Sequence, residues 1–359
     1  MTTDQDAYDG LLVSSDSHVI ESPELWATGL PASFRDQAPR FPKAAGPFQA
    51  HPGGWDPHAR IEEMEQDGVS AEVLYPTLAL NLYQLDNAAL QEACFAVYNQ
   101  WLAEYCREAP ERLIGIAAVA AYDIQSAVRE LERAQRMGLR GVVVWQTPPA
   151  ELPFYSDHYD RFWDAAQGLE MPVSLHILTG HDWSRRLSTE LLTGRTLSPE
   201  EKMEMGEYAF RGVVNSKLLS AVNGLHDVMM SGVFQRFPRL KLVLAENEIG
   251  WLPFVLDQWD KYYLRGMGKM LPLDTPPTEC FREHCYATFF NDRVGARMLQ
   301  WWGGGNCMWS NDFPHPNSTW PDSRKVVERD LGDLDEAPRA ALTWKTVCDL
   351  YKIRNPVDG

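Results

Sequence analysis

The chain contains little cysteine, and its cysteines are scattered. Its 6 cysteines among 359 residues include no Cys-x-x-Cys spacing, which argues against a disulfide framework and against a structural zinc site built on cysteine. Long hydrophobic runs are also missing, since no apolar stretch approaches the roughly 20 residues of a membrane-spanning helix. The first ten residues are polar and acidic, unlike a secretory signal. We therefore expect a soluble, cytoplasmic protein.

Basic residues are outnumbered by acidic ones. The 33 Lys and Arg residues against 50 Asp and Glu residues give a formal net charge of −17. Binding to nucleic acid or to an anionic membrane depends on clustered basic residues, so we expect neither as a partner. Hydrophobic residues are plentiful at 45% of the chain, with 11% aromatic. This composition predicts a globular protein with a substantial core.

Short apolar segments alternate with helical segments along the chain. The unbroken apolar run at residues 113–119 suits a strand that is covered on both faces, as in parallel sheets. Eight such units point to a closed (β/α)8 TIM-type barrel rather than an open doubly wound sheet. No Gly-x-Gly-x-x-Gly follows the first strand, which argues against a dinucleotide-binding domain. The predicted strands are residues 11–18, 71–76, 113–119, 141–145, 171–177, 240–246, 286–290 and 307–310.

Two stretches interrupt this alternation. Residues 29–57 hold six prolines and four glycines, and residues 179–206 are polar and irregular in pattern. Long loops in compact domains usually cover or shape a binding site, so we expect both stretches to be insertions at one rim of the barrel. Two helices are predicted to close the chain. Because α/β barrels run longer than other domains, we expect a single domain over residues 1–359.

Metal-binding residue types occupy the ends of four predicted strands. Asp16 and His18 end the first strand, where the alternation of side chains places both on one face. His176 ends the fifth strand, Glu246 the sixth, and Asp312 follows the eighth. Each alone has an ordinary structural interpretation, such as a core histidine or an aspartate that caps a turn. Because barrel chemistry lies at the C-terminal ends of the strands, the four together indicate a metal site.

These segments resemble the amidohydrolase superfamily. The resemblance is closest to the branch that contains aminocarboxymuconate-semialdehyde decarboxylase and related metal-dependent hydrolases, and it spans nearly the whole chain. Its most specific element is the Asp-Phe-Pro-His sequence at the eighth strand, in register with the other strand ends. The segments that carry the resemblance are Asp16-Ser17-His18, Ser174-Leu175-His176, Phe237-Pro238-Arg239-Leu240-Lys241, Ile249-Gly250-Trp251 and Ser310-Asn311-Asp312-Phe313-Pro314-His315.

The resemblance implies one divalent metal ion held by Asp16 or His18 or both, together with His176 and Asp312. Zinc is the first choice and manganese the second, because mixed imidazole and carboxylate ligation suits either ion. The chain departs from the family pattern twice. Asp16 stands where a first histidine is common, and Glu246 stands where a histidine commonly handles a proton. Whether Asp16 binds the metal directly or orients His18 stays open at this point.

The resemblance implies an enzyme that acts on a small molecule, and two reactions compete. The first is non-oxidative decarboxylation of a small aromatic or unsaturated cyclic acid, with Glu246 or His315 supplying a proton. The alternative is hydrolysis of an amide, ester, lactone or C–C bond, with Glu246 as the base. The missing histidine at strand six favours decarboxylation. A barrel that only binds a partner is a remote third reading, because the ligand set is intact.

Further polar residues are expected to contact the substrate, a small carboxylate or cyclic amide. Arg185 and Arg186 lie in the second insertion, where guanidinium groups can bind a carboxylate in bidentate fashion. His181 in the same insertion and Asn311 beside Asp312 complete the predicted substrate contacts. By analogy with barrels that carry extra helices, we expect a homo-oligomer such as a homodimer.

Overall fold

The computed structural model describes residues 7–41, 51–180, 198–211, 215, 217–354 and 356. Eight strands form one sheet in the order β1 to β8, and each consecutive pair is parallel. This arrangement confirms the predicted (β/α)8 barrel. The strands are β1 Val13–His18, β2 Ala71–Tyr75, β3 Leu113–Ala118, β4 Gly141–Val144, β5 Val173–His176, β6 Leu242–Ala245, β7 Cys285–Phe289 and β8 Cys307–Trp309.

The barrel closes between its first and last strands through hydrogen bonds near the strand ends. The backbone N–H of Asp312 donates to the carbonyl of Asp16 at 3.0 Å, and the N–H of His18 donates to the carbonyl of Phe313 at 2.7 Å. The hydroxyl of Ser15 donates to the carbonyl of Trp309 at 2.9 Å. These bonds place the residues that follow β8 directly beside those that end β1.

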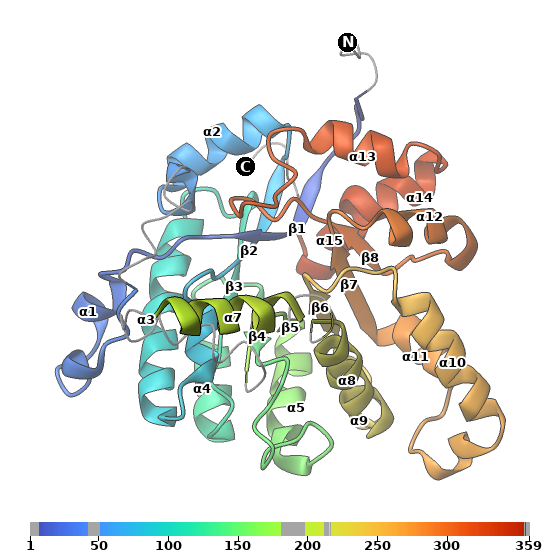
Figure 1. The fold of residues 1–359 in the computed structure, drawn as a ribbon, viewed down its shortest axis with the longest axis horizontal. Helices are drawn as coiled ribbons and strands as arrows, with labels where there is room; N and C mark the ends of the chain where they lie inside the picture. Colours follow the sequence, from blue (N-terminus) through green and yellow to red (C-terminus); the bar gives the residue numbers. More distant parts are fainter. Residues whose placement is uncertain are drawn as a thin grey trace.

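Helices lie between successive strands on the outside of the barrel, and α3, α4 and α5 stand side by side (Figure 1). Four side chains, Asp56, Asn87, Asp123 and Asp292, each cap the following helix by accepting a hydrogen bond from a backbone N–H of its first turn. The helices are α1 Leu25–Gly29, α2 Pro57–Asp67, α3 Ala88–Cys106, α4 Ile124–Arg136, α5 Asp160–Leu169, α7 Pro199–Arg211, α8 Lys217–Met230, α9 Val233–Arg236, α10 Leu252–Leu264, α11 Pro277–His284, α12 Arg293–Trp302, α13 Ser323–Leu331, α14 Glu336–Ala340 and α15 Thr346–Tyr351.

The first predicted insertion contains short helical turns in its described parts. The 3-10 turns η2 Arg35–Gln37 and η4 Pro52–Gly54 lie within it. Further short segments elsewhere are η5 Ala79–Gln84, η6 Asp157–Tyr159, η9 Met267–Met270 and the π-helical turn η10 Ala341–Lys345, which joins α14 to α15. Residues 42–50 of the insertion lie outside the described residues.

The second insertion holds less irregular structure than the sequence predicts. The pattern predicts irregular structure over residues 179–206, but residues 199–206 form the first turns of α7, so this part of the prediction is wrong. The physical reason is a capping box. The hydroxyl of Ser198 accepts from the N–H of Glu201 at 3.1 Å, and the Glu201 carboxylate accepts from the N–H of Ser198 at 2.8 Å. Pro199 suits the first helical position, where its missing N–H has no intrahelical partner to lose.

The strands are buried on both faces, apart from the half-buried Tyr286. Inside the barrel, the phenol oxygen of Tyr75 lies 2.9 Å from Oγ of Ser174 and 3.4 Å from the phenol oxygen of Tyr351 on α15. Tyr351 also lies beside Gly141, the first residue of β4, so α15 covers the N-terminal end of the barrel. None of the described helices is long and apolar enough to span a membrane.

Candidate metal centre

The end of β1 presents Asp16 and His18 to the mouth of the barrel, and both are fully buried. Ser17 points away from them, as strand alternation predicts, and its hydroxyl donates to Oδ1 of Asn311 at 2.7 Å. The Nδ1 atom of His18 lies 2.8 Å from the carbonyl oxygen of Pro76. A hydrogen on Nδ1 satisfies that carbonyl and leaves the Nε2 lone pair of His18 available to a metal ion.

His176, the last residue of β5, has the same orientation. Its Nδ1 atom lies 2.9 Å from the carbonyl oxygen of Ile177, which leaves Nε2 facing the barrel mouth. That Nε2 atom is 3.7 Å from Oδ1 of Asp16 and 3.7 Å from Oε2 of Glu246. The imidazole rings of His18 and His176 meet edge to face, with centroids 5.1 Å apart. Two imidazoles therefore converge on one point.

The segment after β8 adds Asp312 and His315. Asp312 has a left-handed backbone with φ 54°, which is uncommon outside glycine and costs about 1 kcal/mol or more. Its Oδ1 atom lies 3.4 Å from Nε2 of His18 and accepts a hydrogen bond from Nδ1 of His315 at 2.9 Å. Nε2 of His315 lies 3.1 Å from Oγ1 of Thr77, and its ring stacks on His18 at 4.0 Å between centroids. His315 thus orients the Asp312 carboxylate.

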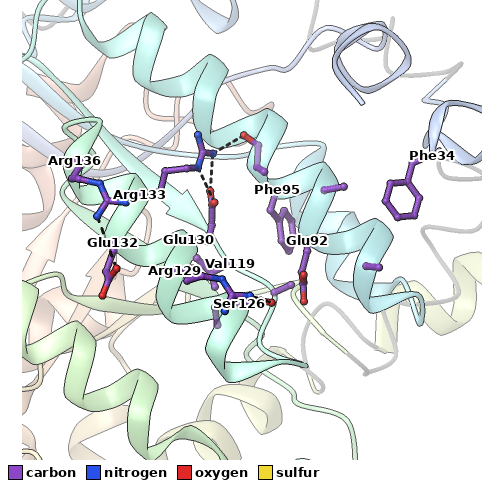
Figure 2. A pocket seen from close by; sticks show the side chains of 15 residues that line it. Phe34, Glu92, Phe95, Val119, Ser126, Arg129, Glu130, Glu132, Arg133 and Arg136 are labelled. Atoms are coloured by element: carbon purple, nitrogen blue, oxygen red, sulfur yellow. Dashed lines mark hydrogen bonds and ion pairs between the residues drawn. The ribbon is translucent and has the colours of Figure 1, made fainter. Parts of the chain in front are cut away.

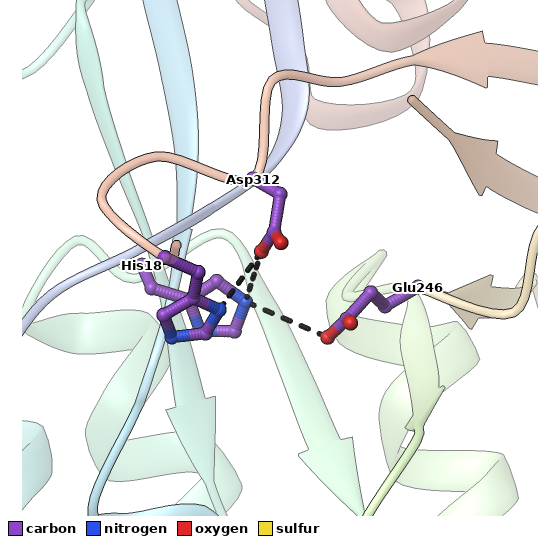
Figure 3. Close-up of side chains that lie close together, drawn as sticks. His18, Glu246 and Asp312 are labelled. Carbon is purple, nitrogen blue, oxygen red and sulfur yellow. Dashed lines mark hydrogen bonds and ion pairs between the residues drawn. The ribbon is translucent and has the colours of Figure 1, made fainter. Parts of the chain in front are cut away.

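Glu246 follows β6 and directs its carboxylate into the same cluster. Figure 3 shows the carboxylates of Glu246 and Asp312 both directed at the same ring nitrogen of His18, Nε2. Oε2 of Glu246 lies 4.0 Å from Nε2 of His18, and Oε1 lies 3.9 Å from Nζ of Lys217 on α8. Burial and then the charge of Asp312 raise the pKa of Glu246 to about 7, against the charges of Lys217 and His176. Its carboxyl group can therefore carry a proton near neutral pH.

Buried atoms around this point have no hydrogen-bond partner among the residues that the structure describes. Buried polar atoms are normally satisfied, so a cluster of such atoms without hydrogen-bond partners fits a cation-binding site. Candidate ligand atoms within each of two overlapping groups lie within 4.8 Å of one another. Mixed imidazole and carboxylate donors fit a divalent metal ion. The unsatisfied atoms are Oδ1 of Asp16, Nε2 of His18, Nε2 of His176 and Oδ2 of Asp312.

The pKa values of the two histidines shift in opposite directions. Burial, followed by the charges of His315 and His176, holds the pKa of His18 well below its usual value, so His18 is neutral and ready to bind a metal ion. Burial also lowers the pKa of His176, but the neighbouring carboxylates of Asp16 and Glu246 outweigh it and raise that pKa overall.

A family model described as Amidohydrolase matches residues 16–353, a span that runs from Asp16 past His315. The chain belongs to the amidohydrolase family. The family predicted from the strand ends is therefore confirmed. Because the match covers nearly the whole chain, it includes every strand end that contributes to the metal centre.

Several known proteins of similar sequence or structure are named as decarboxylases. This amidohydrolase is 24% identical over 319 residues to a gamma-resorcylate decarboxylase of Polaromonas sp., covering 82% of this chain and 86% of that protein. The structure of a 5-carboxyvanillate decarboxylase from Sphingomonas paucimobilis superimposes with a TM-score of 0.71 at 20% identity, covering 96% of this chain and 99% of the other.

A second solved structure is similar over an even larger share of the amidohydrolase. It is a dihydroxybenzoic acid decarboxylase from Polaromonas sp. with bound manganese and the inhibitor 2-nitroresorcinol. Its TM-score is 0.68 at 19% identity, covering 98% of this chain and 100% of the other. At such identities the two structures show that the fold is shared.

Three residues near the amidohydrolase's candidate ligands carry no signal in the sequence. Thr288 on β7 donates a hydrogen bond to Oδ2 of Asp16 at 2.9 Å and accepts one from the N–H of Glu246 at 2.7 Å. Threonine is common in strands, so nothing in the pattern marks this one. Lys217 on α8 and Thr77 after β2 reach the cluster from segments with no metal-binding motif. Only the folded chain reveals these three residues.

Asn311 does not take the predicted role of a substrate contact. It is 1% exposed, its Oδ1 accepts from the hydroxyls of Ser14 and Ser17, and its Nδ2 donates to Glu72 at 2.9 Å. We therefore correct its assignment, because its side chain supports β1 from inside the protein. The other predicted substrate contacts, His181, Arg185 and Arg186, lie outside the described residues.

A cavity of about 770 Å³ lies on the outer wall of the barrel between α3 and α4 (Figure 2). Its walls include Glu92 from α3, Arg129 from α4 and Phe34 from the first insertion. None of its 15 lining residues belongs to the candidate metal centre. The candidate metal centre and this outer cavity are therefore separate sites.

Proposed function

We propose that this amidohydrolase is a metal-dependent decarboxylase of a small aromatic acid. The observation that carries the proposal is the position of Glu246, a buried carboxyl whose Oε2 lies 3.7 Å from Nε2 of the candidate ligand His176 and 4.0 Å from Nε2 of His18. Such a group can deliver a proton to a substrate held at the metal. The similar proteins support the same reaction class, since all three are named as decarboxylases. We infer that the substrate is a hydroxylated benzoic acid.

The residues that would hold the metal are Asp16, His18, His176 and Asp312. Each has a buried side-chain atom without a partner among the described residues, which supports direct binding by Asp16 as well. When bound, the metal supplies a Lewis acid that orients and polarises an oxygen of the substrate. We favour manganese over the zinc that the sequence favours, because carboxylate oxygens suit manganese and the Polaromonas structure contains it.

Glu246 is the proton donor in this scheme. Its proton forms the new C–H bond at the ring carbon that bears the carboxylate. The C–C bond to that carboxylate then breaks, its electron pair returns to the ring, and CO₂ leaves. Glu246 remains as a carboxylate and regains a proton from solvent. His315 is the less suitable donor, because both of its ring nitrogens are engaged, one with Asp312 and one with Thr77.

Lys217 supplies the cation beside the proton donor. Its Nζ atom lies 3.9 Å from Oε1 of Glu246, and its side chain is 22% exposed at the barrel mouth. An ammonium group there can pair with the carboxylate or phenolate of an incoming acid. We therefore assign Lys217 to substrate binding, a role the sequence places on the second insertion.

The test is a substrate panel read by mass. Manganese-loaded protein is incubated with hydroxybenzoates and, in parallel, with cyclic amides. We expect loss of CO₂ from at least one hydroxybenzoate. His176→Ala should abolish it, and His58→Ala, at a histidine that is 79% exposed, should not. Gain of water by any substrate would contradict the proposal and favour the metal-dependent hydrolase instead.

A further inference from the structure

The hydroxyl group of Thr288 joins two acidic residues of the candidate metal centre. Thr288 lies on β7 and is 0% exposed. Oγ1 is 2.9 Å from Oδ2 of Asp16 and 2.7 Å from the backbone nitrogen of Glu246. Because β8 lies between β7 and β1 in the barrel, the hydrogen bond from Thr288 to Asp16 joins two strands that are not neighbours. One hydroxyl group therefore connects the ends of β1 and β6.

The chemistry of the three groups fixes the direction of both hydrogen bonds. A backbone N–H can only donate, so Oγ1 of Thr288 has to accept from Glu246. The single hydroxyl proton is then free for Asp16, whose Oδ2 accepts it. Because the hydroxyl is fully buried, water does not offer an alternative partner. The orientation of the Thr288 hydroxyl follows from its surroundings.

This arrangement divides the two oxygens of Asp16 between different tasks. Oδ2 is held by Thr288, while Oδ1 has no partner among the described residues and lies 3.6 Å from Nε2 of His18 and 3.7 Å from Nε2 of His176. Oδ1 is therefore the Asp16 oxygen that no hydrogen bond from the described residues competes for when a metal ion binds. Hydrogen-bond partners behind a ligand commonly set its orientation and its affinity for the metal.

The same hydroxyl holds the backbone of Glu246. Glu246 has φ 56°, in the left-handed region that residues other than glycine rarely occupy. Its N–H donates to Thr288, and this bond holds the peptide from which the Glu246 side chain reaches the cluster. Residues in such conformations persist where their surroundings determine them, and they gather at functional sites.

We propose that Thr288 is a positioning residue that makes Asp16 a ligand through Oδ1 alone and keeps Glu246 directed at the metal. The inference rests on the metal centre of the proposed function and not on the reaction assigned to it. The hydrogen bonds of the Thr288 hydroxyl go to Asp16 and Glu246, so it acts through these two residues. Its hydroxyl group, rather than its methyl group, is the part that matters.

The experiment compares Thr288→Ser, Thr288→Ala and Thr288→Val in the full-length protein. Manganese affinity is measured by competition with a chelator, and bound manganese is examined by electron paramagnetic resonance. The serine variant should bind manganese within about threefold of wild type, whereas the alanine and valine variants should bind about 10- to 100-fold more weakly and give an altered spectrum. Serine and alanine differ only by the hydroxyl group.

Thr147→Val is the matched control, because Oγ1 of Thr147 is buried without a hydrogen-bond partner in the described part of the chain. It should bind manganese like wild type. Equal affinity of the Thr288→Ala and Thr288→Ser variants would overturn the proposal. If the serine variant folds but the alanine and valine variants do not, the proposal is also overturned, because the hydroxyl is then needed for folding. If the affinities fall as expected but wild type decarboxylates nothing, the positioning role stands and the proposed reaction fails.

Discussion

The Nε2 atom of His18 lies 3.4 Å from Oδ1 of Asp312, although the two residues come from opposite ends of the chain. Backbone hydrogen bonds from His18 to Phe313 and from Asp312 to Asp16 hold them together, so closing the barrel also builds half of the metal centre. The candidate centre brings buried carboxylates close together, and a cation between them would relieve their repulsion. Metal binding and stability of the fold should therefore be linked.

Added manganese should raise the stability of the protein. At a free concentration of 100 times Kd, the free energy of unfolding should increase by about 2.7 kcal/mol, seen as a higher Tm that a chelator reverses. His176→Ala should lose this response because it removes an imidazole ligand. His58→Ala, at an exposed histidine, should keep it. An equal response in both variants would place the ion elsewhere.

Glu246→Gln should separate chemistry from metal binding. Glutamine keeps the shape of the side chain but cannot donate a carboxyl proton, so kcat should fall about 100- to 10,000-fold. The metal content, measured by elemental analysis, should stay at that of wild type. Glu248→Gln, two residues along, is the control and should keep its activity. Wild-type kcat in the Glu246 variant would exclude Glu246 as the proton donor.

Lys217 should control the pH range in which Glu246 is protonated. Its charge lowers the pKa of Glu246, so Lys217→Met should raise that pKa. Because the protonated form is the donor, activity that is lost as pH rises should be lost at a higher pH in the variant. The pH profile of kcat measures this shift. Lys261→Met is the control, at an exposed lysine on α10, and should leave the pH profile unchanged. A wild-type pH profile in Lys217→Met would show that Lys217 does not affect the pKa of Glu246.

Glu248 should make stability depend on pH. Burial raises its pKa from 4.5 to about 7, against the charge of Lys217, which lowers it. The pKa of Glu248 is higher in the folded protein than in the unfolded chain. The stability that the protonated Glu248 carboxyl contributes is therefore fully present below about pH 4.5 and is lost as pH rises through about 7. Glu248→Gln should therefore be more stable than wild type above pH 7, by at most about 3 kcal/mol. Urea unfolding across pH measures the difference, which should shrink toward pH 4.5.

The sequence predicts the barrel and the polar residues at its strand ends because both follow local rules. Alternating apolar segments indicate the strands, and the polar residue that ends each strand has to lie at the rim. Asp16, His18, His176, Glu246 and Asp312 are found by this reasoning alone. The structure brings these five side chains together at the mouth of the barrel.

Residues that act through tertiary contacts leave no such signal. Thr288 is an ordinary strand threonine until the barrel places it beside Asp16. Asn311 shows the opposite case, because its position next to Asp312 suggests substrate binding, while its side chain in the segment after β8 bonds to Ser14 and Glu72. The helix that begins at Pro199 is missed because its polar composition is typical of a loop, although Ser198 and Glu201 form a capping box at its start.

A buried ion pair lies next to the candidate metal centre and bonds to two of the segments that form it. The side chains of Arg60 and Glu72 are 0% and 1% exposed, and Nε of Arg60 donates to Glu72 at 2.5 Å. Arg60 also donates to the carbonyl of His18 at 2.7 Å, and Glu72 accepts from Asn311 at 2.9 Å. The Arg60–Glu72 pair therefore joins α2 and β2 to the end of β1 and to the segment after β8.

Arg60→Met should destabilise the protein by about 3–5 kcal/mol, because it leaves the charge of Glu72 buried without a partner. Chemical denaturation measures the loss. Arg297→Met is the matched control, since Arg297 pairs with Asp333 at an exposed site, 75% and 72% exposed, and should cost no more than about 1 kcal/mol. Adding Glu72→Met to Arg60→Met should recover part of the loss, because the uncompensated charge is then gone. If Arg60→Met and Arg297→Met lose the same free energy of unfolding, burial does not make the Arg60–Glu72 pair more important for stability than an exposed pair.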